Sequence, residues 1–270
     1  MDGKARRCGR HRPHLLILNG GEDTMEEKNM NIMEHASEFR KRLIIVLGSF
    51  IVLFGAAFSY VDQIYNWIVD ASTIKLTVLG PTEILWVYFV LAGFFAITAV
   101  FPIALFHVWR FISPALSKDE KKAFFLYLPA IILFFFTGIG FGYYVLFPNV
   151  LAFLTSLAGD ELNTMFTAEK YFRFLLNLTL PIAFLFELPI LVMFLTRIGI
   201  INPELLAKTR KVSYFVLTVV STLVTPPDLV SAILVLAPLI LLYELGMMLS
   251  KIVYRKKLKF MGGEGMRAEG

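Results

Sequence analysis

The sequence predicts an all-α membrane protein with six transmembrane helices and both termini on one side of the bilayer. The 270-residue chain is 57% hydrophobic and has a mean hydropathy of +0.69, values outside the usual range of soluble domains. Its apolar residues gather in six stretches joined by short connections. Lys and Arg are abundant in every second connection only, an asymmetry typical of multi-pass membrane proteins.

The six stretches cover residues 43–61, 84–109, 123–147, 174–196, 212–224 and 229–250. The first four are long enough to cross a hydrocarbon core of about 30 Å at about 1.5 Å per residue. The fifth gives only about 20 Å of helix, and the sixth is uninterrupted by charge only from Leu229 to Tyr243. We therefore expect the last two spans to be short, either sheltered by longer helices or set in a thinned bilayer.

Prolines lie inside four of these stretches. Each proline removes a backbone hydrogen bond and bends its helix. Several bent helices side by side predict a curved, concave wall. The prolines are Pro102, Pro129, Pro181 with Pro189, and Pro238.

The basic residues orient the chain. Loops rich in Lys and Arg stay in the cytoplasm, so the alternation predicts a multi-pass protein of the cytoplasmic membrane with both termini cytoplasmic. This basic rim also accounts for the net charge of +5, and no nucleic-acid partner is expected. The rim consists of Arg40, Lys41, Arg42, Arg110, Lys118, Lys121, Lys122, Arg197, Lys208, Arg210, Lys211, Lys251, Arg255, Lys256, Lys257 and Lys259. The other connections hold Lys75, Lys170 and Arg173.

The two ends of the chain differ from its middle. Residues 1–29 are predicted to be a disordered extension or a start-site artefact, because Met25 and Met30 are both possible starts. Residues 259–270 are Gly-rich and predicted to be a disordered tail. Residues 30–258 then form a single membrane domain.

The motif content excludes the common catalytic chemistries. The sequence has no phosphate-binding loop, no HExxH motif and no paired CxxC motifs. Its four His residues are scattered and Cys8 is its single cysteine. We therefore expect no enzymatic activity, no cofactor and no metal site.

Two carboxylates interrupt the apolar stretches. Glu187 lies near the middle of the fourth stretch, and a charge there costs at least a few kcal/mol. Such a residue is either functional or a neutral carboxyl that bonds a neighbouring helix. Glu244 is nearer the end of the last stretch and can extend toward Lys251 and Arg255, which favours a structural role.

Two further acids lie on the basic face. Glu38 belongs to an expected interfacial helix before the first span and can form an i,i+4 ion pair with Arg42. Glu120 stands three residues after Ser117, the spacing of a capping box. Alternatively, the two carboxylates bind a pair of guanidinium groups through charge-assisted hydrogen bonds.

On the opposite side, residues 225–228 read TPPD. The two prolines end the fifth stretch, and Asp228 can cap the N-terminus of the next helix.

Taken together, the short motifs along the chain resemble the TatC family, the multi-spanning subunit of the twin-arginine protein translocase. The resemblance runs from about Glu34 to Arg255, and the segments TEILWVYF and TAEKYFRFLLNL look most like versions from Gram-positive bacteria. The motifs are EHASEFRKRL (34–43), LGPTE (79–83), WRFISPALSKDEKK (109–122), FGYYVLFP (141–148), FLFELP (184–189), RIGIINPELL (197–206), VTPPD (224–228) and LLYELG (241–246).

The resemblance implies a receptor for the twin-arginine signal peptides of folded cargo proteins. It also implies assembly with single-span TatA-type subunits, self-association in the translocon and transport driven by the proton-motive force. The short hairpin of spans five and six would then be a docking site for the small partner.

The resemblance also implies roles for individual residues. Matched by position, Glu38 and Glu120 are the acids that contact the signal peptide, surrounded by Arg40, Phe111 and Pro114. Glu187 matches an intramembrane acid that contacts a partner. Asp228 matches the acid of the outer turn, and Glu244 is a secondary candidate.

Two other functions are also compatible with the residues alone. A secondary transporter would use Glu187 for ion coupling, although the sequence shows no internal repeat. A purely structural scaffold would keep the partner contacts without preferring any signal peptide.

Overall fold

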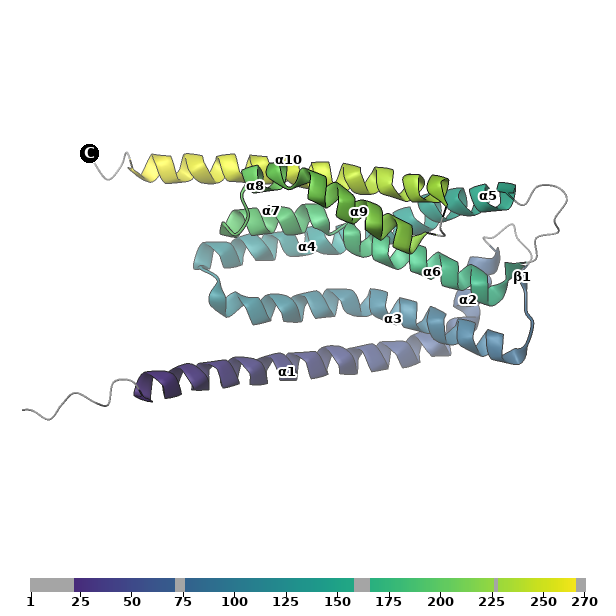
Figure 1. Ribbon diagram of the computed structural model, residues 1–270. Coiled ribbons are helices and arrows are strands. Elements are labelled where there is room, and N and C mark those ends of the chain that lie inside the picture. The colour runs from purple at the N-terminus through teal and green to yellow at the C-terminus, as the bar shows by residue number, and fades with distance from the viewer. Residues whose placement is uncertain (1–21, 71–75, 158–165, 226–227, 266–270) are drawn as a thin grey trace, which may run out of the picture. The chain divides into compact units, whose positions relative to one another are not determined.

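The computed structural model describes residues 22–70, 76–157, 166–225 and 228–265. Residues up to Ile45 and residues from Val46 onward form two units, and each is described by itself. Almost all of the described chain is helical, which confirms the predicted fold class (Figure 1).

Among the described residues, five helical segments are long and apolar enough to cross a membrane. They correspond to the first four and the sixth of the predicted stretches. The segments are Ser37–Ser59, Pro81–Ile112, Glu120–Leu157, Ala168–Ile198 and Leu229–Arg255.

The first span belongs to α1 (Glu22–Ser59), an unbroken helix that α2 (Val61–Asp70) follows. The expected interfacial helix is therefore continuous with the first span. Residues 1–21 lie outside the described residues, so an irregular N-terminal extension stays a prediction there. From Glu22 the backbone is helical, and this segment is rich in Glu, Lys and Met, which favour helix.

The third span is longer than predicted because the helix does not end at position 147. Helix α4 (Lys118–Phe141) passes through a single π-helical turn, η2 (Gly142–Leu146), into α5 (Phe147–Leu157). A π-helical turn inserts residues into a helix without ending it. The apolar residues that follow position 147 therefore continue the third helix.

The last two spans differ from each other in length. Helix α9 (Arg210–Val224) has 15 residues, or about 22 Å of helix, and is as short as predicted. Helix α10 (Leu229–Gly265) has 37 residues, so the prediction of a short last span is wrong. The charge of Glu244 does not end the helix, because the carboxylate has partners on α9. Residues 266–270 lie outside the described residues.

A two-stranded parallel sheet that the sequence did not predict joins two connections on one side of the second unit. Strand β1 (Leu76–Thr77) precedes α3 (Pro81–Ile112), and β2 (Phe166–Thr167) precedes α6 (Ala168–Leu185). Each strand has two residues. The sheet fixes the start of α3 beside the start of α6.

Close backbone approach of α4 and α6 organises the core of the second unit. A Cβ atom at Gly138 would lie 2.8 Å from Ala183 Cα and 2.9 Å from Phe186 Cβ. Nearby, Phe135 is fully buried and its ring stacks on Phe101 of α3 with 3.7 Å between the ring centroids. Small residues at helix crossings are the usual means of packing membrane helices.

We predict that Gly138→Ala destabilises the protein by about 1–3 kcal/mol, because the added methyl meets backbone atoms that cannot move away. The unfolding midpoint in detergent should fall by about 2–4 °C for each kcal/mol. Gly140→Ala is the matched control, since it lies in the same helix and has no atom within 4 Å of its Cβ position. Both substitutions gain the same helix propensity. Equal midpoints for the two variants would contradict this account of the α4–α6 contact.

Candidate functional site

Glu38 and Arg40 lie on α1, within the first unit. Glu38 accepts a hydrogen bond from Arg42, four residues later, as the sequence suggested. The Glu38 side chain is 40% exposed, and Arg40 is exposed. A helical i,i+4 ion pair contributes about 0.3–0.5 kcal/mol. The Arg42 side chain is only 13% exposed, so this pair is more shielded from water than an exposed helical pair.

Phe111, Pro114 and Glu120 lie on the connection between α3 and α4, within the second unit. Phe111 is partly buried at the end of α3. Pro114 is exposed on a turn of 3-10 helix, η1 (Ser113–Ala115). The three residues therefore lie at the end of α3, on η1 and in the first turn of α4, within ten positions of one another in the sequence.

Glu120 also has the structural role that its spacing indicated. Its Oε2 atom accepts a hydrogen bond from the Ser117 N–H at 2.8 Å, and Ser117 Oγ accepts one from the Glu120 N–H at 3.4 Å. This capping box begins α4. The cap holds the Glu120 carboxylate at a defined place on the surface.

Glu187 lies at a break in the fourth span, just before Pro189, one of the prolines predicted to bend this helix. Helix α6 ends at Leu185 and α7 (Leu188–Ile198) begins after Glu187. Pro189 explains the position of the break, because a proline has no N–H and its ring clashes with the carbonyl four residues earlier, at Leu185. At the break, the Glu187 N–H donates a hydrogen bond to the Phe184 carbonyl oxygen, three residues earlier, at 3.2 Å.

Both carboxyl oxygens of Glu187 are buried at this break. Neither of its oxygens accepts a hydrogen bond of standard geometry from any described residue. Burial of such a group in an apolar environment is costly. The carboxyl interacts with the backbone of Phe135 on the neighbouring helix α4, so the alternative of a carboxyl that bonds a neighbouring helix stays a prediction.

Asp228 caps α10, as its position after two prolines suggested. Its Oδ1 atom accepts a hydrogen bond from the Ser231 N–H at 2.6 Å. An N-cap of this kind satisfies one of the free N–H groups of the first helical turn. The cap accounts for Asp228 without a ligand.

Glu244 has partners on α9 and not, as the sequence suggested, Lys251 or Arg255. Its Oε2 atom accepts a hydrogen bond from Arg210 at 2.9 Å, and its Oε1 atom accepts one from the Tyr214 hydroxyl. Sequence spacing could not reveal this pairing, because Glu244 lies 34 residues from Arg210. The result is a polar clamp between α9 and α10, formed by Arg210, Tyr214 and Glu244.

Glu83 is a connecting residue that sequence reasoning did not single out. Its Oε2 atom accepts a hydrogen bond from the Leu79 N–H at 2.7 Å, and its Oε1 atom accepts one from the Glu169 N–H at 2.8 Å. One carboxylate therefore binds the starts of both α3 and α6. The sequence feature that could have identified Glu83 is an acidic residue in the first turn of a helix that begins with Gly-Pro.

Comparison with known proteins identifies the family. The model of the family described as Sec-independent protein translocase protein (TatC) matches residues 34–238, more than half of the chain. The chain belongs to the TatC family. Family membership makes it a component of a protein translocase, and hence a multi-pass membrane protein with a transport function and not an enzyme.

Individual relatives agree with this assignment. The chain is 50% identical over 235 residues to the Sec-independent protein translocase protein TatCd of Bacillus subtilis, covering 87% of this chain and 97% of that protein. It is 38% identical over 251 residues to the TatC protein of Halalkalibacterium halodurans, with 91% and 99% covered. The crystal structure of a twin-arginine translocase receptor, TatC, superposes with a TM-score of 0.73 at 32% identity and covers 81% of this chain and 99% of that one.

We predict that the polar clamp couples α9 to α10 by about 1 kcal/mol, because the Arg210 side chain is 43% exposed and its ion pair is partly screened. A double-mutant cycle with Arg210→Gln and Glu244→Gln, followed by unfolding in detergent, measures this coupling. The exposed pair Arg173–Glu169 serves as the control and should couple by about 0.3–0.5 kcal/mol. Strictly additive effects of Arg210→Gln and Glu244→Gln would show that the clamp does not hold the two helices together.

Proposed function

We propose that this TatC-family protein is the subunit that recognises twin-arginine signal peptides on folded cargo proteins. The proposal rests mainly on its likeness, over most of both chains, to a solved structure described as a twin-arginine translocase receptor. The chemistry of its basic face is consistent with that role, since two acids lie there among many Lys and Arg residues.

Recognition would depend on Glu38 and Glu120. A guanidinium group presents paired donors that match the two oxygens of a carboxylate, whereas an ammonium group binds as a point charge. The two acids are therefore suited to discriminate Arg from Lys. Arg40 would repel other cations close to Glu38, and Phe111 and Pro114 would contact the apolar residues that follow the arginine pair.

The orientation follows from the charge asymmetry of the connections. We propose that the α3–α4 connection and both termini are cytoplasmic, because loops rich in Lys and Arg remain on that side of the cytoplasmic membrane. Glu38 and Glu120 would then meet the signal peptide before transport begins.

We predict that the purified protein in detergent binds a fluorescent twin-arginine peptide more tightly than the same peptide with both arginines changed to lysine. Glu38→Gln and Glu120→Gln should each weaken binding of the arginine peptide about tenfold, as expected for one charge-assisted contact of about 1.5 kcal/mol. Fluorescence anisotropy gives both dissociation constants.

Glu204→Gln is the matched control for this measurement, because it removes an equal charge from an exposed residue of α8 (Pro203–Lys208). It should leave the affinity unchanged. Equal binding of the two peptides to the unaltered protein would reject the receptor role in the isolated subunit. Equal loss in all three variants would mean that net charge, and not a specific site, governs binding.

The protein would work with other membrane subunits. We propose that its partners are single-span subunits of the TatA type and further copies of itself, and that the proton-motive force drives transport. Glu187 supports a partner contact, because its carboxyl is buried at a helix break, where it interacts with the Phe135 backbone but makes no hydrogen bond of standard geometry with the described residues. A polar group of an inserted helix could satisfy this carboxyl.

We predict that Glu187→Gln abolishes or strongly reduces export while the protein remains stable, because Gln has nearly the same shape and its amide oxygen can keep the interaction with the Phe135 backbone. Export of a folded reporter in cells lacking their own TatC protein, together with the unfolding midpoint in detergent, checks both parts. Glu187→Asp retains the acid and should restore some export. Full export by the Gln variant would remove Glu187 from the mechanism.

A further inference from the structure

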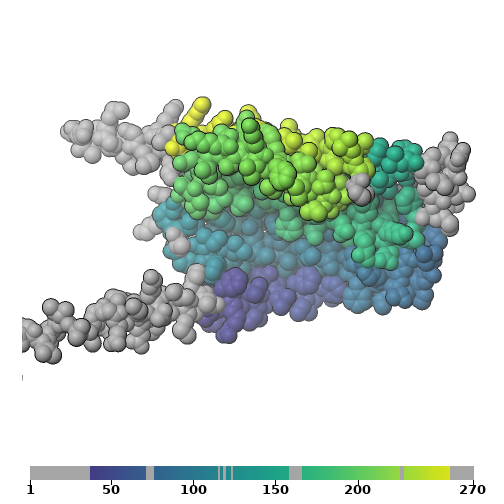
Figure 2. All heavy atoms as spheres, viewed as in Figure 1, coloured from purple at the N-terminus to yellow at the C-terminus, as the bar shows by residue number. Residues whose placement is uncertain are grey.

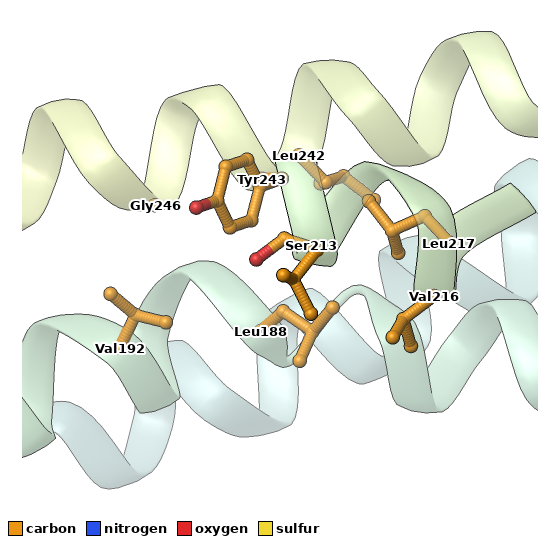
Figure 3. Close-up of a pocket in the computed structure, with 9 residues that line it drawn as sticks. Leu188, Val192, Ser213, Val216, Leu217, Leu242, Tyr243 and Gly246 are labelled. Atoms are coloured by element: carbon orange, nitrogen blue, oxygen red, sulfur yellow. The ribbon is translucent and has the colours of Figure 1, made fainter. Parts of the chain in front are cut away.

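An apolar groove of about 260 Å³ lies between α7, α9 and α10 (Figure 3). In Figure 3, Leu188 and Val192 of α7 lie on one side of it, and Leu242 and Tyr243 of α10 lie on the other. The lining residues are Leu188, Val192, Val212, Ser213, Val216, Leu217, Leu242, Tyr243 and Gly246.

The groove has too few polar side-chain atoms to form a binding site for a polar ligand. Among its side chains only Ser213 and Tyr243 carry a hydroxyl group. The Tyr243 hydroxyl donates a hydrogen bond to the Leu206 carbonyl oxygen at 2.8 Å. The remaining lining is aliphatic, so the groove suits a hydrocarbon.

The groove opens on a surface that would face the bilayer. Val212 is 63% exposed and Val216 is 51% exposed, and both lie on α9. Figure 2 shows α9 at the surface of the second unit in the same view as Figure 1. Because α9 provides only about 22 Å of helix, lipid beside it has to adapt to a span shorter than the hydrocarbon core.

Uncompensated positive charge lies at the end of the groove nearest the start of α9. Lys211 precedes the lining residue Val212 on α9, and Lys208 is the last residue of α8, the helix before it. Both lysines are exposed, and neither has an ion-pair partner within the described ranges. Arg210 differs, since Glu244 neutralises it. The local charge is therefore positive where the headgroup of a lipid in the groove would lie.

We propose that this groove binds one acyl chain of an anionic phospholipid whose phosphate contacts Lys208 and Lys211. The apolar lining selects the chain and the two lysines select the headgroup charge. A transmembrane helix is about 10 Å across, so it can lie over a groove of this volume but cannot enter it. The bound lipid would fill the space beside α9 and support the short helix against α7 and α10.

Native mass spectrometry of the full-length protein in detergent tests the proposal. The protein is titrated separately with phosphatidylglycerol and with phosphatidylcholine of identical acyl chains. We expect one phosphatidylglycerol to be retained per chain, with a clear preference over phosphatidylcholine. Each lysine should contribute about fivefold to this preference, so that Lys208→Gln/Lys211→Gln reduces it roughly 25-fold.

Two further variants make the test specific. Ser213→Leu fills the groove without altering the Arg210–Glu244 pair and should abolish retention of the lipid. Lys121→Gln/Lys122→Gln removes the same charge from α4 and should leave retention unchanged.

Three outcomes would overturn the proposal. Equal retention of the two lipids would show that the lysines do not discriminate between the two headgroups. Unchanged retention in Ser213→Leu would show that the lipid binds elsewhere. Loss of a single-span subunit from the purified complex of Ser213→Leu, with lipid retention unchanged, would assign the groove to a protein partner.

Discussion

The absence of water in the hydrocarbon core is the constraint on which the rest of this structure depends. A polar group there must find its partner within the protein or remain unsatisfied at a cost of several kcal/mol. Thr196 and Ser250 meet this requirement with a buried hydrogen bond of 2.7 Å between α7 and α10. Glu244 meets it through the polar clamp with Arg210 and Tyr214. These contacts show how α10 remains one helix despite an internal charge.

Glu187 meets this requirement less completely than Glu244 does, and it lies at a break in its helix. Pro189 interrupts the fourth span one turn after Leu185, and the buried carboxyl of Glu187 lies at the interruption. Unsatisfied polar groups in proteins cluster where a ligand, a proton or a partner completes them. The same site therefore combines an interrupted backbone with a buried carboxyl group.

The short helix α9 links several features of the second unit. Its length leaves it unable to span the core alone, so its stability depends on contacts with α10. The polar clamp supplies a directional contact at one end, and Tyr243 binds the Leu206 carbonyl oxygen nearby. The apolar groove lies between these helices and α7. A hairpin held in this way presents both an apolar surface and a positive edge to the bilayer.

The sequence by itself determined the helical class, the number and order of the apolar stretches, the caps at Ser117 and Asp228, and the motifs that resemble the TatC family. These features depend on periodicity, composition and residue spacing within one or two helical turns, and such local rules act before tertiary packing. Only the tertiary structure decided that Glu244 pairs with Arg210, that Glu83 joins α3 to α6, and that the Glu187 carboxyl is buried against the Phe135 backbone. Those outcomes depend on which helices lie side by side, and in a chain whose stretches are all apolar the hydrophobic pattern cannot specify the neighbours.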